Sequence, residues 1–386
     1  SRAPIQRLAD RVAGWLVYLA LGGAAVTYLV TRDLTATISV VIVAGACGVA
    51  AGTPLAVLAA IARSARSGAF VKDGAHLEAL STVDTVVFDK TGTLTHGEPE
   101  VTAAVAAEGF DADELLALAA GAETYSEHPV GQAIVRQAAA SGLVALAPEG
   151  FVYEPGQGVT AEVGGRRVAA GNARLVPGAP PRLQAGSAVH VAIDGVYAGS
   201  VVLSDRVRDS ASGCVKALRR MGIRVVMFTG DGRDAARAVG AELGIGDVRA
   251  ELLPTAKSEL VRRLRAEGRR VAMVGDGIND APALAEADVG IAMGSGTHVA
   301  RESADMVLIS SDLADLTEAV RTARRARRII LANVAGTIAV DVLGMLLAAV
   351  GVLGPLLAAV VHVGSESAFI LNSARLIPPR SPARRP

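Results

Sequence analysis

The chain has 386 residues, more than a single domain usually holds, and its 38 basic and 38 acidic residues cancel. Because the net charge is zero and aromatic residues make up only 3% of the chain, composition predicts no nucleic-acid partner. Apolar residues make up 51% and gather towards the two ends, and two cysteines are too few for a disulfide framework or a cysteine-rich metal cluster.

Two apolar stretches lie near the start. Residues 12–31 and about 36–61 are each long enough to cross a bilayer as a helix, and arginines precede the first stretch and follow the second. The positive-inside rule therefore places both outer flanks in the cytoplasm. A second span follows the first at once, which argues against a removable signal peptide.

The second stretch is rich in small residues around Cys47. Gly45, Gly48, Gly52 and Pro54 weaken a helix there, and free backbone carbonyls at membrane depth are tolerated only when they face protein or a wet cavity. One interpretation is an ion site. The other is a small-residue packing face in which Cys47 is simply buried, and the residues alone leave both open.

A β-branched and aromatic run over 83–88 ends in Asp89, followed by Lys90, Thr91, a glycine and further hydroxyls. This pattern predicts a buried strand that carries a carboxylate to a polar loop, although a lone aspartate there is more often a helix cap. Two later strands, at 223–228 and 270–274, also end in acidic glycine loops. Since ligands bind at the carboxyl ends of strands in open α/β sheets, we expect a site at that edge.

The composition changes at 96–99, and residues 98–200 read as an insert that begins with a helix from Asp111 to Ala120. Its polar features are Glu123, His128 and glycine turns at 156–158 and 171–172. Each feature alone is weak, because such residues usually cap helices or form turns. We expect Asp205 and Arg208 to hold the hinge where the insert rejoins.

A basic helical run over 321–328 precedes apolar stretches at about 330–350 and 355–372. Next to a span, the run is better interpreted as a cytoplasmic membrane flank than as a nucleic-acid patch. His362 and Glu366 are four residues apart and therefore share a helix face. Ionisable residues inside a membrane are costly, so a functional role is expected.

Residues Asp89 to Thr95 resemble the phosphorylation signature of P-type ATPases. The insert resembles the nucleotide-binding domain of heavy-metal members. The resemblance implies a haloacid-dehalogenase-like phosphorylation domain with a doubly wound parallel sheet, an inserted α+β nucleotide domain and four transmembrane helices. The implied boundaries are 1–72 for two membrane helices and a stalk, 73–97 and 201–319 for the phosphorylation domain, 98–200 for the nucleotide domain, and 320–386 for a second stalk and two membrane helices.

The resemblance also implies roles for particular residues. Lys257 neutralises a phosphoryl group on Asp89, and Asp89, Thr91 and Asp276 hold Mg²⁺. The remaining catalytic positions are Lys90, Thr229, Gly230, Asp231, Asn279 and Asp280. The positions expected around ATP are Glu123, His128, Gly156, Gly158, Gly171 and Asn172.

Thr91 is informative about the fate of an aspartyl phosphate. Soluble phosphatases of the wider superfamily usually have a second aspartate at this position, which acts as acid and base. Without a positioned base to activate water, the phosphorylated intermediate should persist long enough to drive a conformational change.

For the cargo, the resemblance aligns Gly45-Ala46-Cys47 with the Cys-Pro-Cys motif of heavy-metal pumps and His362 with a His-Glu-Gly-Ser stretch of zinc and cobalt pumps. The second cysteine is kept, while the central proline and the first glutamate of those motifs are replaced. Cys47, His362 and Glu366 are therefore the expected ligands of the transported cation. This mixed donor set favours Zn²⁺ or Co²⁺, with Cu⁺ and Cd²⁺ as alternatives.

We therefore expect ATP-driven transport of a transition-metal cation, in the export direction, through an aspartyl phosphate. The expected setting is the plasma membrane of a prokaryote, with the termini and large domains in the cytoplasm and an actuator domain encoded upstream in the same polypeptide. The alternatives are a truncated or non-transporting pump fragment and a membrane-tethered phosphatase.

Overall fold

The computed structural model describes residues 4–44, 47–180 and 187–378. The chain divides into two compact units. The first contains Ser1–Val87, Lys216–Arg224 and Ser258–Pro386, and the second contains Phe88–Val215 and Val225–Lys257. Four elements cross a boundary between them along the chain: β2 (Thr85–Asp89), α7 (Asp209–Arg220), β9 (Arg224–Phe228) and α9 (Pro254–Ala266).

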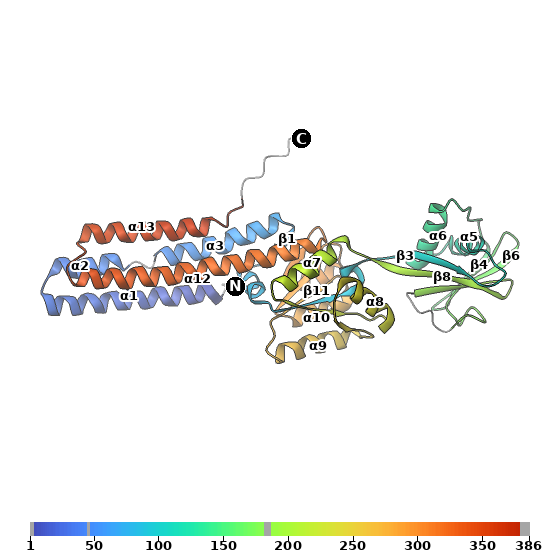
Figure 1. The fold of residues 1–386 in the computed structure, drawn as a ribbon, viewed down its shortest axis with the longest axis horizontal. Coiled ribbons are helices and arrows are strands. Elements are labelled where there is room, and N and C mark those ends of the chain that lie inside the picture. Colours follow the sequence, from blue (N-terminus) through green and yellow to red (C-terminus); the bar gives the residue numbers. More distant parts are fainter. Residues whose placement is uncertain (1–3, 45–46, 181–186, 379–386) are drawn as a thin grey trace, which may run out of the picture. The chain divides into compact units, whose positions relative to one another are not determined.

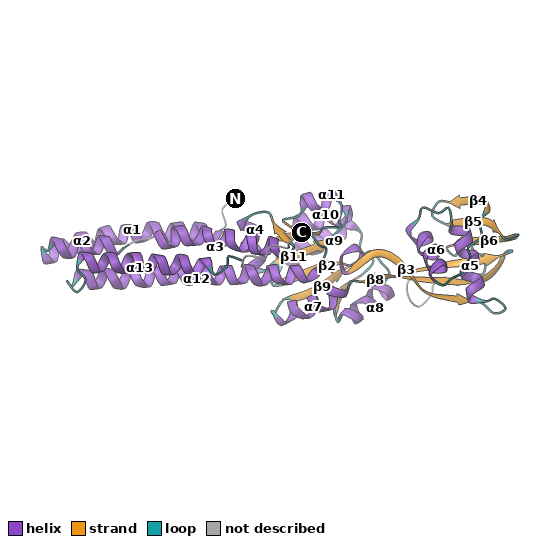
Figure 2. Cartoon of the chain, turned by 90° about the horizontal axis from the view of Figure 1, so that it is seen from above, coloured by secondary structure: helices purple, strands orange, loops and turns teal. Residues whose placement is uncertain are grey.

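Apolar helices of the first unit lie side by side (Figures 1 and 2). Small and branched residues such as Ala24, Val43 and Ala348 are buried between them. The outer surface carries exposed large apolar side chains such as Trp15 and Leu356, as expected for helices that face lipid rather than water. The helices are α1 (Pro4–Thr31), α2 (Leu34–Val43), α3 (Cys47–Arg66), α12 (Leu313–Ala349) and α13 (Pro355–Ala374).

The apolar stretch 36–61 is interrupted, as its glycines and proline led us to expect. The segment forms two helices, α2 and α3, and α2 ends at Val43 within the glycine-rich stretch. Glycine disfavours helix, which explains why the apolar run does not continue as one helix. Among the described residues, α1, α12 and α13 are each long and apolar enough to cross a membrane, and α2 is a shorter apolar helix.

The first unit also contains four strands in the order β1-β13-β12-β11. β11 (Val271–Gly275), β12 (Val289–Met293) and β13 (Met306–Leu308) are parallel, and β1 (Ala69–Val71) is an antiparallel edge. Every residue of β11 and β12 is buried, as is usual for parallel strands. The helices α4 (Gly74–Thr82), α10 (Ala281–Glu286) and α11 (His298–Ser303) belong to the same unit.

The second unit contains a parallel strand pair and a separate antiparallel sheet. β9 (Arg224–Phe228) pairs with β10 (Asp247–Arg249), and α8 (Arg233–Leu243) connects them. The antiparallel sheet has the order β3-β8-β7-β6-β5-β4 (Figure 2). Its strands are β3 (Thr95–Ala106), β4 (Glu149–Glu154), β5 (Gly158–Val163), β6 (Arg166–Gly171), β7 (Ser187–Ile193) and β8 (Val196–Val207).

Two helices cover one face of the antiparallel sheet. They are α5 (Ala112–Glu123) and α6 (Pro129–Ala140), and residues such as Leu115, Ile134 and Val191 form the core between helices and sheet. Asp111 caps α5 by accepting hydrogen bonds from the backbone of Asp113 and Glu114. Parallel strands, an antiparallel sheet with two helices, and apolar helices together confirm the predicted fold class.

Candidate active site

The buried strand β2 ends at Asp89, whose side chain is itself buried. The following loop, Lys90–Leu94, turns at Gly92, which has a positive φ of 71°. Glycine adopts this backbone conformation at little cost. The turn leaves Thr91 exposed, next to a buried carboxylate.

Lys257 lies beside Asp89, as the sequence predicts. Its Nζ donates a hydrogen bond to Asp89 Oδ1 at 2.5 Å, and both side chains are more than 90% buried. Lys257 is in the first turn of α9, near Pro254 at the start of that helix. A buried cation next to a buried carboxylate is the arrangement that neutralises charge on a phosphoryl group transferred to that carboxylate.

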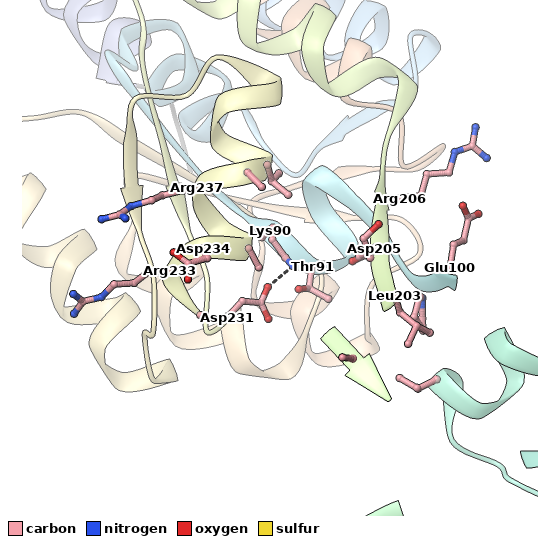
Figure 3. Close-up of a pocket in the computed structure, with 18 of the residues that line it drawn as sticks. Lys90, Thr91, Glu100, Leu203, Asp205, Arg206, Asp231, Arg233, Asp234 and Arg237 are labelled. Atoms are coloured by element: carbon pink, nitrogen blue, oxygen red, sulfur yellow. Dashed lines mark ion pairs between the residues drawn. The ribbon is translucent and has the colours of Figure 1, made fainter. Parts of the chain in front are cut away.

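The loop after β9 adds a second pair of groups. The Thr229 hydroxyl donates to Asp231 Oδ2 at 3.0 Å, and the backbone N–H of Asp231 donates back to Thr229 Oγ1 at 3.1 Å. Lys90 forms an ion pair with Asp231 (Figure 3). The structure therefore brings Asp89 together with Lys257, and Lys90 together with Thr229 and Asp231.

Three other predicted positions belong to the first unit and follow β11. Asp280 is buried, and a Cβ on Gly275 would come within 2.7 Å of its side chain, so only glycine fits there. Carboxylate oxygens of Asp276 and Asp280 approach within 4.8 Å of each other. Two close carboxylates offer the oxygen donors that Mg²⁺ prefers, so these residues fit the ion. Asn279 is exposed.

The expected hinge residues hold the Asp89 loop. Arg208 Nε donates to the carbonyls of Thr93 and Thr95 at 3.0 Å, and its Nη2 donates to that of Gly92 at 2.9 Å. Asp205 accepts hydrogen bonds from the Thr95 hydroxyl and, at 2.9 Å, from the backbone of Gly97. Burial raises the pKa of Asp205, which these hydrogen bonds partly offset.

Glu123 and His128 lie at the two ends of the short connection between α5 and α6. Burial raises the pKa of Glu123, and the hydrogen bond with Ser126 opposes that shift. Gly131 permits this packing, because a Cβ there would meet Glu123 Oε2 at 2.2 Å. His128 is exposed and caps α6: its Nδ1 accepts a hydrogen bond from the backbone of Val130 at 3.2 Å.

The predicted glycines lie where β5 and β6 come closest. Gly158 pairs with Gly171, and a Cβ on either would come within 2.2 Å of a carbonyl oxygen of the neighbouring strand or turn. Asn172 ties the next turn in place, since its side-chain amide donates to the carbonyl of Gly156 at 2.8 Å. These glycines therefore have a packing role, whatever ligand the turns bind.

A cleft of about 1450 Å³ in the second unit extends from the loop after Asp89 to the glycine turns of the antiparallel sheet (Figure 3). Lys90, Thr91 and Asp231 line it, and so do Gly156 and Asn172 from the antiparallel sheet. The cleft is large enough for a nucleotide whose phosphates point towards Lys90. Basic side chains on its wall include Arg206, Arg233 and Arg237 (Figure 3).

Among the predicted cargo ligands, His362 Nε2 lies 3.3 Å from Glu366 Oε1 on α13. The side chain of Cys47 lies outside the described residues, although α3 begins at this position. Sequence reasoning missed Asp341 on α12, which is 2% exposed and close enough to Glu366 for their charges to interact. Its Oδ2 has no hydrogen-bond partner among the described residues. The missed signal was a lone acid within the apolar run 330–350.

Comparisons with known proteins agree with this geometry. A model of haloacid dehalogenase-like hydrolases matches residues 83–288. A copper-transporting ATPase 2 of Rhizobium meliloti (strain 1021) is 42% identical over 342 residues, which are 83% of this chain and 41% of that protein. A copper-exporting P-type ATPase of Bacillus subtilis (strain 168) is 38% identical over 398 residues, 97% of this chain and 50% of its own length.

The fold also matches a solved structure of a zinc-transporting PIB-type ATPase in its E2.Pi state. The TM-score is 0.87 at 35% identity, and the match covers 98% of this chain and 65% of the other. The chain thus spans about half or less of the length of the two curated relatives.

Proposed function

Because the chain belongs to the heavy-metal P-type ATPases, within the haloacid dehalogenase-like hydrolases, we propose that it is the catalytic and membrane part of an ATP-driven pump for a transition-metal cation. The observation that carries this proposal is the buried Asp89–Lys257 pair at the end of β2, beside an exposed Thr91. The cargo leaves the cytoplasm, and the membrane is the cell membrane of a prokaryote with the large domains on its inner side.

The proposed reaction begins with attack by an Asp89 carboxylate oxygen on the γ-phosphorus of ATP. The new bond joins that oxygen to phosphorus, the bond to the β,γ-bridging oxygen breaks, and ADP leaves with the electron pair. Lys257 offsets negative charge at Asp89, and the Thr229 loop offers donors to the phosphoryl oxygens. Bound through Asp89, Thr91 and Asp276, Mg²⁺ would supply further charge neutralisation.

Nucleotide recognition falls to the antiparallel sheet and its two helices. The buried Glu123 and the exposed His128 flank the connection before α6. The Gly158–Gly171 pair has no side chains that project from the sheet beside Asn172. In this arrangement the base and ribose lie against the sheet, and the phosphates extend along the cleft to Lys90.

The proposed cargo site is formed by Cys47, His362 and Glu366, to which we add Asp341. A thiolate, an imidazole and carboxylates suit Zn²⁺ or Co²⁺ better than Cu⁺, which prefers soft sulfur donors. The relatives are named as copper, silver and zinc transporters, so the choice of ion rests on the donors of this chain.

Incubation with radiolabelled ATP and Mg²⁺ tests the central step. Asp89 should form an acid-stable adduct that hydroxylamine removes, because an acyl phosphate has that chemistry. The label should be absent in Asp89→Asn and unchanged in Asp113→Asn, which makes the same change on the surface of the second unit. Label that persists in Asp89→Asn would contradict the assignment.

A further inference from the structure

His190 is a polar residue at a position where the strand pattern calls for an apolar one. On β7 its neighbours Val189 and Val191 face the core under α5 and α6, so His190 faces the opposite side of the sheet. The side chain is only 5% exposed and nevertheless lines the cleft shared with Thr91 and Asn172. Burying an imidazole on a strand of valine and alanine costs free energy unless its ring nitrogens have hydrogen-bond partners.

The strand register places His190 in one row with the glycines expected at the nucleotide. Gly158 on β5 pairs with Gly171 on β6, Gly171 pairs with His190, and His190 pairs with Ser200 on β8. Residues directly opposite each other in neighbouring strands lie on the same face. His190 therefore shares the face of the two glycines and is directly adjacent to Gly171.

A short hydrogen-bond chain fixes the imidazole. His190 Nδ1 lies 2.8 Å from Ser200 Oγ, and the Tyr197 hydroxyl lies 2.7 Å from the same Ser200 oxygen. The Tyr197 ring also contacts the His190 ring edge to face, with centroids 6.2 Å apart. Because Nδ1 is engaged, Nε2 is the ring nitrogen left for contact with a ligand.

Burial lowers the pKa of His190. At neutral pH the ring is therefore uncharged. An uncharged ring is suited to hydrogen bonds and stacking with a base or ribose, and gives little attraction for phosphate.

We propose that His190, fixed by Ser200 and Tyr197, is a nucleotide-contacting residue that positions the nucleoside end of ATP in the cleft. This rests on the proposed nucleotide role of the antiparallel sheet, and adds a contact from β7 to those from the α5–α6 connection and the glycine turns. Ser200 and Tyr197 are positioning residues that act through His190.

Equilibrium dialysis of the full chain with labelled ADP tests the contact. His190→Phe should weaken ADP binding about tenfold, roughly the contribution of one hydrogen bond in a buried site. Ser200→Ala and Tyr197→Phe should each weaken it by a smaller factor, because the ring stays but loses its orientation. Thr160→Val is the matched control: it lies on the same sheet face as Gly158, two residues along β5, and should bind ADP as the unsubstituted chain does.

A measurement on the unsubstituted chain removes dependence on how the variants fold. In NMR spectra, the imidazole resonances of His190 are identified by their loss in His190→Gln. These resonances should shift when ADP is added and should not shift with inorganic pyrophosphate. Ring signals that respond equally to pyrophosphate, or to neither ligand, overturn the proposal. If His128→Ala weakens ADP binding while His190→Phe does not, His190 has no such role and the proposed function stands. A chain that binds no ADP overturns the proposed function itself.

Discussion

At the scale of single residues, the surroundings of Asp89 suit both a free carboxylate and a carboxylate that carries a phosphoryl group. Lys257 compensates the buried carboxylate, and removing one partner of such a pair typically costs about 3–5 kcal/mol. A phosphoryl group on Asp89 would keep the lysine compensated. The exposed Thr91 has a hydroxyl where a phosphatase needs a base, so the same loop can form an acyl phosphate without directing water to it.

Replacing Thr91 by aspartate should therefore shorten the lifetime of the phosphorylated intermediate. A positioned general base typically accelerates such a step about 10²- to 10⁴-fold. The decay of labelled adduct after a chase with unlabelled ATP measures the effect. Thr91→Asn provides the control, since it has the same size as aspartate and no basic carboxylate, and it should decay like the unsubstituted chain. Equal decay in Thr91→Asp would show that something other than a missing base excludes water.

Glu123 should make the α5–α6 region sensitive to pH. Its folded-state pKa is raised by burial above the unfolded value, so the fold favours the protonated carboxyl, and this stabilisation is lost as pH rises through the raised pKa. Glu123→Gln keeps the shape without the charge. Amide exchange in α5, compared between the two proteins at each pH without nucleotide, should show the Gln variant increasingly better protected as pH rises from 5 to 7. A difference that does not change with pH would rule out Glu123 as the cause.

At this scale the sequence predicts charged groups at strand ends better than polar groups within regular elements. Asp89 is a single acid at the end of an apolar strand, which marks it in the sequence, whereas the roles of Lys257 and Asp231 were implied by the resemblance. Asp341 and His190 were missed, because each is one polar residue in an apolar run and its significance depends on a neighbour from another helix or strand. The capping role of His128 was also not predicted, although Pro129 after it is typical of a helix start.

At the scale of elements, the residue that follows β8 holds the loop that follows β2. Arg208 donates to three backbone carbonyls of the segment 92–95, so the loop conformation around Lys90 and Thr91 depends on a side chain more than a hundred residues away. A planar guanidinium satisfies several carbonyls at once, which a lysine ammonium does less well.

Arg208→Lys should thus lower the rate of phosphorylation of Asp89, because the loop loses hydrogen bonds to its backbone carbonyls. The loss of one such hydrogen bond corresponds to a decrease of about tenfold. The affinity for ADP should stay unchanged. Rapid-mix labelling with ATP and equilibrium dialysis with ADP separate the two effects. Arg166→Lys is the matched control in the same unit, because Arg166 does not line the cleft and its ion pairs are with Glu114 and Asp194. Loss of ADP affinity in Arg208→Lys would instead indicate a wider folding defect.

The predicted bounds of helices and strands agree best with the structure where capping residues and hydrophobic periodicity indicate the same boundary. The expected helix from Asp111 is present with its acidic cap, and the strands at 223–228 and 270–274 shifted by one residue at their starts. The apolar stretch 36–61 forms the two helices α2 and α3, a break that hydropathy alone does not locate. Three glycines and a proline lie within the ten residues 45–54, and both residue types disfavour a helix interior.

At the scale of the whole molecule, catalysis and cargo binding are assigned to different parts of the chain. The proposed cargo ligands come from α3, α12 and α13, all in the first unit, whereas Asp89 and Lys257 belong to the second. Thr53, Thr337 and Asp341 each have a buried oxygen without a hydrogen-bond partner among the described residues. Buried polar groups of this kind require water or an ion.

The purified full chain should accordingly bind Zn²⁺ or Co²⁺ through these helices. Cobalt absorption spectroscopy reports both binding and ligand type, and a Cys47 thiolate should give a charge-transfer band that is absent in Cys47→Ala. His362→Ala and Asp341→Asn should each weaken binding at least tenfold, since each removes one donor. His298→Ala, which removes an exposed histidine outside the apolar helices, should have no effect. Binding that survives all three site substitutions would exclude this site.

The continuous helix α12 joins two regions of the first unit. Arg324, in the first third of the helix, donates hydrogen bonds to the carbonyls of Met221 and Val83, and Asp341 lies seventeen residues further on. At a rise of 1.5 Å per residue the two are about 26 Å apart along one rigid rod. A tilt of only about 5° at the Arg324 end would swing Asp341 by about 2 Å, roughly the length of a metal–oxygen bond, and so release a bound ion. α12 would then act as a lever arm, because a small rotation at Arg324 becomes a displacement of the ligand Asp341 large enough to break its bond to the ion.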